Sequence, residues 1–436
     1  MQTRRGKVQG VLRRAEAVTR RLGAGHADHR LPPGELDSLD ELEKADRAAL
    51  QRRAERLGPV FKGLVGDERT VCIVGLARCR RFLKDHGDDV EIVTQDLTAM
   101  FPGGFLRAMS GDTHRDYRRA LVRAVRSADG DVALAEFESL AAAELRRYAT
   151  TSAQHQNRPE AWTSSLSDVS TGLLVRTFFG ASPGSATHAS LVEGFRDLGP
   201  YGLVWNPQAR QHAAFGRLCL DLRTELVARH EGRSEMSPTC LLAALDDDGE
   251  LDETMLGNLI YMVEMGRSDI HNFLRWLSRY VASDQALCDA IALGDTTHGV
   301  RTLEEALVLE VLRADQSERL ERRTLAEVTF EGYVIPAGTH LRLCMWEAHH
   351  DAAAFADPHV FDPSRFLHAT PSSDVFAPFG LDHHQCPFGA LTTRIGTSFV
   401  RALCAYRPTL LADGPPVRGA YHWEPSRRLA VELVPR

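Results

Sequence analysis

The sequence predicts a mainly helical protein with a small β-rich part. Apolar residues recur every three or four positions through many stretches of the 436-residue chain, the longest running from Leu251 to Ala282. Two short apolar runs at 60–65 and 69–74, separated by Gly66-Asp67-Glu68, instead predict a β-hairpin. A chain of this length can form one large domain with several lobes or two or three average domains.

The composition is that of an ordinary soluble globular protein, with 43% hydrophobic and 25% charged residues. A net charge of −7 argues against nucleic acid as a partner. The eight cysteines form no C-x-x-C pair, which argues against a disulfide framework or zinc ribbon and favours a reducing, cytoplasmic location. No run approaches the ~20 apolar residues that span a bilayer, and 1–22 lacks the apolar centre of a secretory signal.

The N-terminal two thirds are expected to alternate helices with turn-rich breaks. Residues 1–42 are a polar arm and linker, and 43–436 are expected to form a single domain. Irregular loops are expected at 91–105, which holds Pro102-Gly103-Gly104, and at the aromatic break 199–207. Helices are expected at 43–57, 75–86, 131–149, 164–179, 189–198, 209–230 and 284–292.

Two basic side chains share one face of the helix that follows Met109. His114 and Arg118 are four residues apart, so they project from the same side. Such a pair can bind two carboxylates of one ligand through charge-assisted hydrogen bonds. A solvated basic face is the commoner meaning of this spacing.

The longest helix contains Gly266, although a glycine inside a helix costs about 1 kcal/mol. Close approach of a flat ligand would explain it, and so would a bend or tight helix packing. Further along the chain, Thr302 and Glu305 form a capping box that opens another helix. Glu310 and Arg313 lie on one face of this apolar helix, so we expect a buried ion pair that needs a further partner.

The stretch Phe379-Gly380-Leu381-Asp382-His383-His384-Gln385-Cys386 precedes a helix expected at 390–405. A cysteine that binds a metal ion through its sulfur must be deprotonated, and hydrogen-bond donors must hold the resulting thiolate. The unpaired first amides of a helix and the helix dipole favour such an anion, and Pro387 suits the first turn. An inert buried cysteine in an ordinary loop is the alternative.

This stretch resembles the cysteine-ligand signature of the cytochrome P450 family, with Phe379, Gly380, His384 and Cys386 on matching positions. Asp382 and Phe388 depart from it, because both stand where the family prefers Gly. The resemblance implies haem b (iron protoporphyrin IX) with Cys386 as the iron ligand, in a soluble, bacterial-type enzyme. The other residues that it places on the cofactor are His114, Arg118, Arg322 (with Arg323 as its rival), His384, Phe379, Gly266 and Met265.

The resemblance also implies the cytochrome P450 fold, mainly α with a small β lobe. One catalytic domain at 43–436 would hold the haem between the long central helix and the helix after Cys386. Arg365, in Phe361-Asp362-Pro363-Ser364-Arg365, would complete a structural triad with Glu310 and Arg313. Residues 199–207 resemble the mobile lid over the family's substrate channel.

The central helix departs from the family at the point where oxygen is activated. The family places Gly-x-Asp/Glu-Thr there, whereas this chain has Gly266-Arg267-Ser268-Asp269, preceded by Met265. Ser268 and Asp269, with Glu264 one turn earlier, are the candidate catalytic residues. Either they carry a proton relay with changed geometry, or the relay is lost. In a third interpretation Asp269 binds a substrate amine, or pairs with Arg267 or water.

The function implied is oxygen-dependent oxidation, by hydroxylation or another tailoring step, of a small secondary-metabolite substrate. Electrons would come from a ferredoxin and ferredoxin reductase type of donor, docking near Cys386, and we expect a monomer. The altered relay motif keeps open a non-monooxygenase chemistry: peroxide-driven oxidation, coupling or cyclisation, rearrangement, or nitrene-type transfer. The two missing glycines keep open a non-catalytic haem-binding partner protein.

Overall fold

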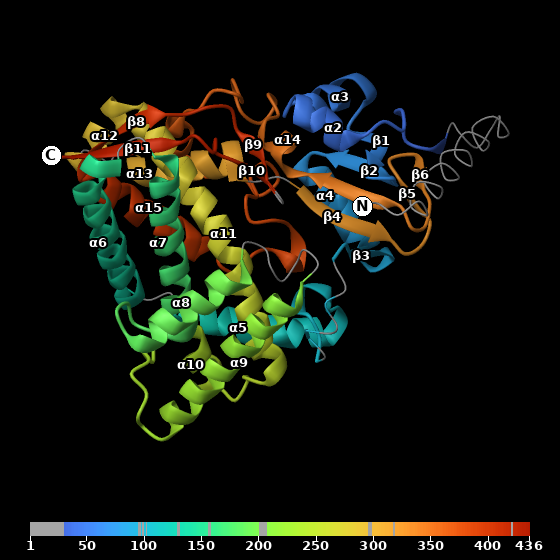
Figure 1. Cartoon of the computed structure of the whole chain (residues 1–436). Coiled ribbons are helices and arrows are strands. Elements are labelled where there is room, and N and C mark those ends of the chain that lie inside the picture. Colours follow the sequence, from blue (N-terminus) through green and yellow to red (C-terminus); the bar gives the residue numbers. More distant parts are fainter. Residues whose placement is uncertain are drawn as a thin grey trace. The chain divides into compact units, whose positions relative to one another are not determined.

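The computed structural model describes residues 30–94, 97, 100–101, 103–128, 131–155, 158–199, 207–294, 299–316, 319–419 and 422–436 (Figure 1). These residues divide into two compact units. The described parts of Met1–Val93, Ser317–His359 and Pro371–His383 form the first, here called the sheet unit. The described parts of Thr94–Gln316, Val360–Thr370 and His384–Arg436 form the second, here called the helical unit. The single domain expected over 43–436 stays a prediction.

The sheet unit is built on a five-stranded sheet of order β1-β2-β7-β4-β3. Its strands pair antiparallel except for β2 and β7, which run parallel from Thr70 opposite His340 to Val74 opposite Cys344. The strands are β1 (Val60–Val65), β2 (Glu68–Val74), β3 (Val90–Ile92), β4 (Arg319–Thr324) and β7 (His340–Cys344), with a separate hairpin of β5 (Val328–Phe330) and β6 (Tyr333–Ile335). The helices are α2 (Leu39–Ala45), α3 (Ala49–Leu57), α4 (Leu76–His86), η2 (Gly87–Asp89) and α14 (Met345–His349).

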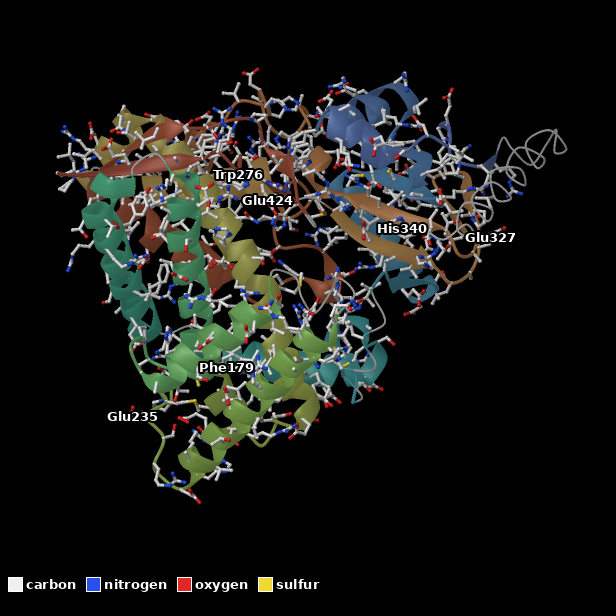
Figure 2. The ribbon with its side chains drawn as sticks, in the orientation of Figure 1. Phe179, Glu235, Trp276, Glu327, His340 and Glu424 are labelled. Atoms are coloured by element: carbon white, nitrogen blue, oxygen red, sulfur yellow. The ribbon has the colours of Figure 1, made fainter. Side chains whose placement is uncertain are left out.

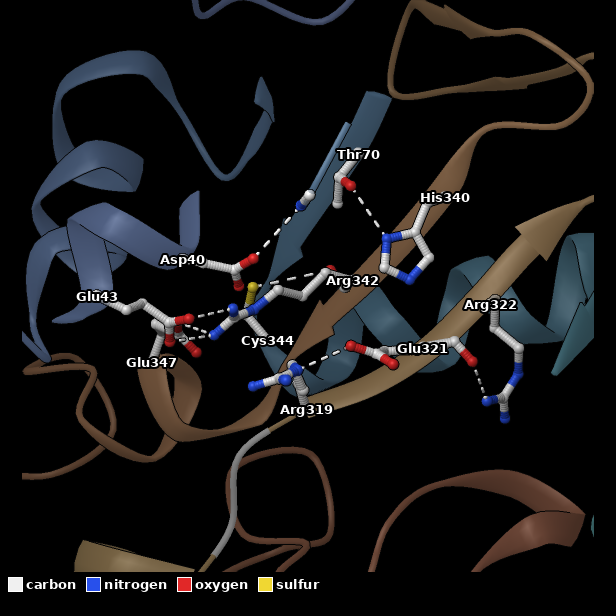
Figure 3. Close-up of polar contacts among 11 residues, drawn as sticks. Asp40, Glu43, Thr70, Arg319, Glu321, Arg322, His340, Arg342, Cys344 and Glu347 are labelled. Carbon is white, nitrogen blue, oxygen red and sulfur yellow. Dashed lines mark hydrogen bonds and ion pairs between the residues drawn. The ribbon is translucent and has the colours of Figure 1, made fainter. Parts of the chain in front are cut away.

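A buried ion cluster ties two helices to the centre of this sheet. Arg342 on β7 is 2% exposed and donates to both oxygens of Glu43 on α2 at 2.7 Å (Figure 3). It also donates to Glu347 on α14 at 3.2 Å, and the two acids raise the pKa of Arg342 despite its burial. Breaking such a buried cluster typically costs ~3–5 kcal/mol, because it leaves a charge unpaired. The cluster therefore fixes α2 and α14 on the sheet.

The helical unit is organised around α11 (Glu253–Ser283), which has 31 residues and is capped by the side chain of Asp252 on the amide of Met255. Its contacts include α7 and α15. The remaining helices are η3 (Leu106–Ala108), α5 (Gly111–Ala128), α6 (Asp131–His155), α7 (Pro159–Phe179), α8 (Ala186–Leu198), α9 (Ala209–His230), α10 (Leu241–Asp247), α12 (Gln285–Ala292), α13 (Leu303–Val311), the π-helical turn η4 (Leu312–Gln316), η5 (Pro363–Phe366), η6 (Asp382–His384), which begins in the sheet unit, and α15 (Gly389–Cys404).

Two small antiparallel ribbons complete the helical unit. One pairs β8 (Tyr406–Ala412) with β11 (Ala430–Pro435), and the other pairs β9 (Val417–Arg418) with β10 (Trp423–Glu424). The short ribbon packs near α11, because Trp276 of α11 donates to the carbonyl of Trp423 at 3.4 Å. Figure 2 labels Trp276 and Glu424 at this place.

The mainly helical fold with a small β part is confirmed, as are the hairpin at 60–74 and the capping box of Thr302 and Glu305. The single helix expected at 43–57 is wrong, because α2 ends at Ala45 and α3 starts at Ala49. The Asp46 carboxylate accepts from the amide of Ala48 at 3.0 Å and so caps the break between them. Pro387 precedes α15 and its N-cap Phe388, so it lies just before the first turn. None of the described helices has the length and apolar run needed to cross a membrane.

Candidate active site

The Cys386 thiol lies immediately before α15, where the helix presents unpaired amides. The backbone N–H of Phe388 hydrogen-bonds to the sulfur and lowers the pKa of the thiol, as does the charge of Arg118. Burial is the larger effect, and the pKa of Cys386 is raised overall. The side chain nevertheless keeps accessible surface. A side chain that is both surrounded by protein and accessible lines a concave surface.

Helix α5 contacts the loop of Cys386 through the two basic side chains predicted from their spacing. His114 is 3% exposed, and its ring centroid lies 4.3 Å from that of His384. The Arg118 guanidinium donates to the carbonyl of Gln385, next to Cys386. The structure therefore brings His114, Arg118 and His384 together beside the thiol.

Asp382 and Phe388, which replace two glycines of the family signature, are accommodated in different ways. Asp382 has a φ of +61°, in the left-handed region that favours Gly but that Asp tolerates better than most residues. Phe388 has an ordinary φ of −96°, and its ring packs against Phe178 at a centroid distance of 5.0 Å. Both residues thus keep the course of the loop.

In the sheet unit, Arg322 and Arg323 point to different partners. Arg322 is 5% exposed, donates to the carbonyl of Glu321 at 2.9 Å (Figure 3) and lies 3.4 Å from the carboxylate of Asp382. Arg323 instead donates to Glu68 at 2.8 Å. Of the two rivals, Arg322 is the one in contact with the cysteine-loop segment. Phe379, from the same segment, is partly buried.

One face of α11 carries Tyr261, Met265, Asp269 and Asn272, at successive spacings of four, four and three residues. Asp269 is 52% exposed, yet burial raises the pKa of its carboxyl, so Asp269 also lines a concave surface. His422 and Arg107 act in the opposite direction and lower that pKa. The charge of Asp269 in turn raises the pKa of the Cys386 thiol, so the two groups lie within electrostatic reach of each other.

Four other residues of α11 that the sequence singled out have neighbours or positions of their own. Glu264 is completely buried, and its carboxylate accepts from Arg267 at 2.8 and 2.9 Å, which favours a structural role over a catalytic one. Arg267 is therefore the partner of Glu264 rather than of Asp269. A Cβ at Gly266 would meet only Leu174 of α7, at 3.3 Å, a tight contact with a side chain that can shift, so the position of Gly266 beside the cofactor stays a prediction. Ser268 is partly buried and lies about 100° around the helix from Asp269.

Glu310, Arg313 and Arg365 meet in the interior of the helical unit. Arg313 donates to both oxygens of Glu310 at 2.7 Å, and both side chains are at most 1% exposed. Arg365 lies 3.5 Å from the same carboxylate and donates to the carbonyl of Val360 at 3.1 Å. The backbone N–H of Asp362 adds a bond to Glu310 at 2.9 Å.

His422 and Arg107 are neighbours of Asp269 that the sequence did not reveal. His422 Nδ1 lies 3.8 Å from Asp269 Oδ1. Arg107 hydrogen-bonds to Tyr261, on the same face of α11 as Asp269. No local spacing links these residues to α11, so no sequence signal could have found them. Within the lid predicted at 199–207, residues 200–206 lie outside the described part of the chain.

These residues fit haem in the helical unit. A soft thiol at a helix start can ligate iron, and the amide of Phe388 and the charge of Arg118 favour its ionised form. Asp269 and Cys386 both line concave surface and sense each other's charge. A mainly helical fold with a cysteine that can ligate haem iron at the start of a helix is typical of the class of haem-thiolate proteins.

Comparison with known proteins identifies the family. The family model for cytochrome P450 matches residues 300–389. Abscisic acid 8'-hydroxylase 3 of rice is 29% identical over 186 residues, which are 38% of this chain and 37% of the relative. A protein of Mycobacterium tuberculosis that carries the name cytochrome P450 138 is 22% identical over 362 residues, 78% of this chain and 80% of the relative.

Solved structures share the fold over nearly the whole chain. Cyanobacterial CYP120A1 with bound retinoic acid matches with a TM-score of 0.71 at 19% identity, covering 92% of this chain and 99% of that one. CYP152N1 with myristic acid matches with a TM-score of 0.69 at 16% identity, covering 93% and 99%. The chain has the cytochrome P450 fold and is similar in sequence to cytochromes P450, and haem is the cofactor that this similarity implies. The chain spans little more than a third of the rice hydroxylase it matches.

Proposed function

We propose that the protein catalyses the oxygen-dependent oxidation of a small organic substrate, by hydroxylation or a related tailoring step. The observation that carries this proposal is the placement of Asp269. Its carboxyl lies on the face of α11 that also carries Tyr261 and Met265 and within electrostatic reach of Cys386, and burial raises its pKa. A carboxyl with a raised pKa holds its proton closer to neutral pH and can donate it during turnover.

Haem bound through Cys386 would supply the activation of molecular oxygen. The chain's own residues then have separate tasks. The Phe388 amide and the Arg118 charge favour the thiolate form of Cys386 and oppose the effect of burial. His114 and Arg118 on α5 are the candidate donors to the haem propionates, and the same role for Arg322 stays a prediction from the sequence. Asp269 holds the proton, while the Glu264–Arg267 pair stabilises the helix that carries it.

The electron donors we propose are a ferredoxin and a ferredoxin reductase. Basic residues are the candidate contacts for such a donor, and three of them have acidic neighbours: Arg80 lies 3.5 Å from Asp374, Arg81 contacts Glu331, and Arg119 lies 3.2 Å from Asp116. Arg394 is the fourth candidate. A monomer in a reducing, cytoplasmic environment is consistent with eight cysteines that are all described and all free of disulfide bonds.

An acidic substrate is favoured by Arg107, an exposed cation that hydrogen-bonds to Tyr261 beside Asp269. The names of three similar proteins mention carboxylic acids: abscisic, retinoic and myristic acid. A zebrafish cytochrome P450 of similar fold binds progesterone, a neutral steroid. Titrating the haem spectrum with an acid and its methyl ester tests the idea. Tighter binding of the acid in wild type, lost in Arg107→Met, is expected, and equal binding of both would contradict it.

The central experiment has two stages. First, the reduced protein is exposed to carbon monoxide, and a thiolate-type absorption band is expected, which Cys386→Ala abolishes. Second, turnover is measured with NADPH and a surrogate ferredoxin pair, and product is counted per NADPH. Asp269→Asn keeps the shape of the side chain but cannot release a proton, so this coupling is expected to fall by about a hundredfold. Unchanged coupling would contradict the proposed role of Asp269, and Asp269→Thr then tests whether the family's alcohol improves it.

Peroxide-driven oxidation is the second candidate. It is favoured by the order of the two groups on α11: the carboxyl of Asp269 shares a helix face with Met265, and the alcohol of Ser268 lies about 100° around the helix from it. Product formed with peroxide alone, and absent with NADPH and the redox pair, would establish it. A thiolate-type spectrum without turnover under either condition would instead favour a haem-binding partner protein.

A further inference from the structure

A chain of hydrogen bonds leads from Arg275 on α11 through Asn272 to His422, which lies near Asp269. Arg275 is 4% exposed, and its guanidinium donates to the carbonyls of Pro425 at 3.2 Å and Ser426 at 2.8 Å. It also donates to Oδ1 of Asn272 at 3.2 Å. Because a guanidinium can only donate, the oxygen of the Asn272 amide must face Arg275, and Nδ2 faces away from it. Arg275 thus fixes which way Asn272 points.

The orientation of Asn272 determines the tautomer of His422. Asn272 Nδ2 lies 3.4 Å from His422 Nε2. Since an amide nitrogen only donates, Nε2 must accept, and the proton of the neutral imidazole lies on Nδ1. In a doubly protonated imidazole, the Nε2–H of His422 would point at the N–H of Asn272 Nδ2. His422 is 7% exposed, so water does not easily replace this partner.

His422 is also held in place by its backbone. Its carbonyl accepts from the amide of Gly419 at 2.9 Å, and the carbonyl of the next residue, Trp423, accepts from Trp276 (labelled in Figure 2). The Nδ1–H of His422 therefore has a fixed direction. It lies 3.8 Å from Oδ1 of Asp269, a gap that a small side-chain rotation or one bridging water closes.

We propose that His422 is the positioning residue of this site. Locked as the Nδ1–H tautomer by Asn272 and Arg275, it donates to Oδ1 of Asp269 and leaves Oδ2 to carry the proton. This inference rests on the proposed function, in which Asp269 is the proton donor. His422 cannot itself accept a proton on Nε2 without losing Asn272, so it orients the acid instead of replacing it.

The other groups that act on Asp269 come from different elements. Arg107 precedes α5 and lowers the pKa of the carboxyl, and Cys386 precedes α15 and senses its charge. Tyr261 lies on α11 itself, with its pKa raised chiefly by burial. None of these contacts depends on His422, so substituting His422 changes one donor to Asp269 and leaves the others in place.

The stretching frequency of carbon monoxide in the reduced holoprotein reports the charge near the cofactor and can be followed against pH by infrared spectroscopy. One inflection is expected in wild type, and Asp269→Asn should abolish it. His422→Leu removes a donor to the carboxylate, so the inflection should move up by about one pH unit. His422→Gln can still donate to Asp269 and accept from Asn272, and should restore the wild-type value.

Three results would overturn the proposal: an inflection that survives Asp269→Asn, an unshifted inflection in His422→Leu, or a shift that His422→Gln fails to reverse. Nitrogen NMR of the diamagnetic carbon monoxide complex needs no variant. It should find His422 protonated at Nδ1, and a proton at Nε2 would refute the tautomer. If instead Asp269→Asn leaves turnover coupling intact while the infrared shifts occur as described, the proposed role of Asp269 fails and the positioning by His422 stands.

Discussion

The buried pair of Glu310 and Arg313 gives a stability prediction whose size follows from the structure. Arg313→Met keeps the bulk of the stem but removes both 2.7 Å bonds to the Glu310 carboxylate. Glu310 is 0% exposed, so its charge would remain in the interior with only the Asp362 amide at 2.9 Å and Arg365 at 3.5 Å. Leaving one member of a buried ion pair alone typically costs ~3–5 kcal/mol. Because Arg365 can move closer, we expect about 3 kcal/mol.

Two further variants separate the charge effect from a loss of packing. Glu310→Leu combined with Arg313→Met leaves no buried charge, and an apolar replacement of a whole buried pair is often neutral or stabilising. The double variant should therefore recover most of the loss. Arg119→Met breaks an exposed pair with the same spacing, since Arg119 and Asp116 are 65% and 68% exposed, and should cost less than about 0.5 kcal/mol.

Urea unfolding of the holoprotein measures these differences. Unfolding is followed by both the helix content and the thiolate-type carbon monoxide band. The urea midpoints of the variants are then compared at equal slope of the free energy against urea concentration. The reasoning is refuted if Arg313→Met costs no more than Arg119→Met. It is also refuted if the double variant is as unstable as Arg313→Met alone, because the loss would then come from packing and not from an unpaired charge.

Three other predictions concern single positions. Burial raises the pKa of Asp269, so the contribution of this carboxyl to stability is present at acid pH and is lost as the pH rises through that pKa. The free energy of unfolding and the turnover coupling, both measured against pH, should show this loss, and Asp269→Asn should remove it. Asp382→Ala should cost ~1–2 kcal/mol in urea unfolding because of its positive φ, and Asp382→Gly should cost less; an equal cost of the two variants would contradict this. Gly396→Ala would place a methyl 2.8 Å from the ring of Phe273, so it should cost ~1–3 kcal/mol of stability and lower the melting temperature. Gly216→Ala has open space around the new methyl and should raise the melting temperature. Equal effects of the two variants would contradict the packing argument.

Local spacing in the sequence was enough to predict much of the fold and part of the site. The helices follow from apolar periodicity, and the side-chain pairs that share a helix face, such as Glu310 with Arg313, meet as expected. Strand β7 (His340–Cys344) was not predicted, although its polar and apolar residues alternate as in a half-buried strand; all five of its residues are buried. Its polar residues are satisfied by distant partners: His340 by Thr70 at 3.0 Å (Figure 3) and Arg342 by two acids.

The same limit applies to the candidate active site. His422 reaches Asp269 from a turn before a two-residue strand, and its tautomer depends on two residues of α11. Neither the strand nor the partners leave a pattern in the sequence. Glu264 and Arg267 lie three residues apart on α11, a spacing from which their ion pair could have been predicted. Long-range contacts, which no local pattern encodes, decide which carboxyl is available for chemistry.

The departures from the family pattern differ in what they alter. A glycine is needed either where φ is positive or where a side chain has no room. At the first kind of position Asp382 replaces the glycine and tolerates its φ of +61°. At the second kind Phe388 has room, because its ring packs against Phe178. The thiolate needs the main-chain N–H of Phe388, which any residue supplies, so these two changes leave the task of the loop intact. On α11 the change falls on side chains that would carry the proton. A functional difference from other family members should therefore be sought at Asp269 rather than at the cysteine loop.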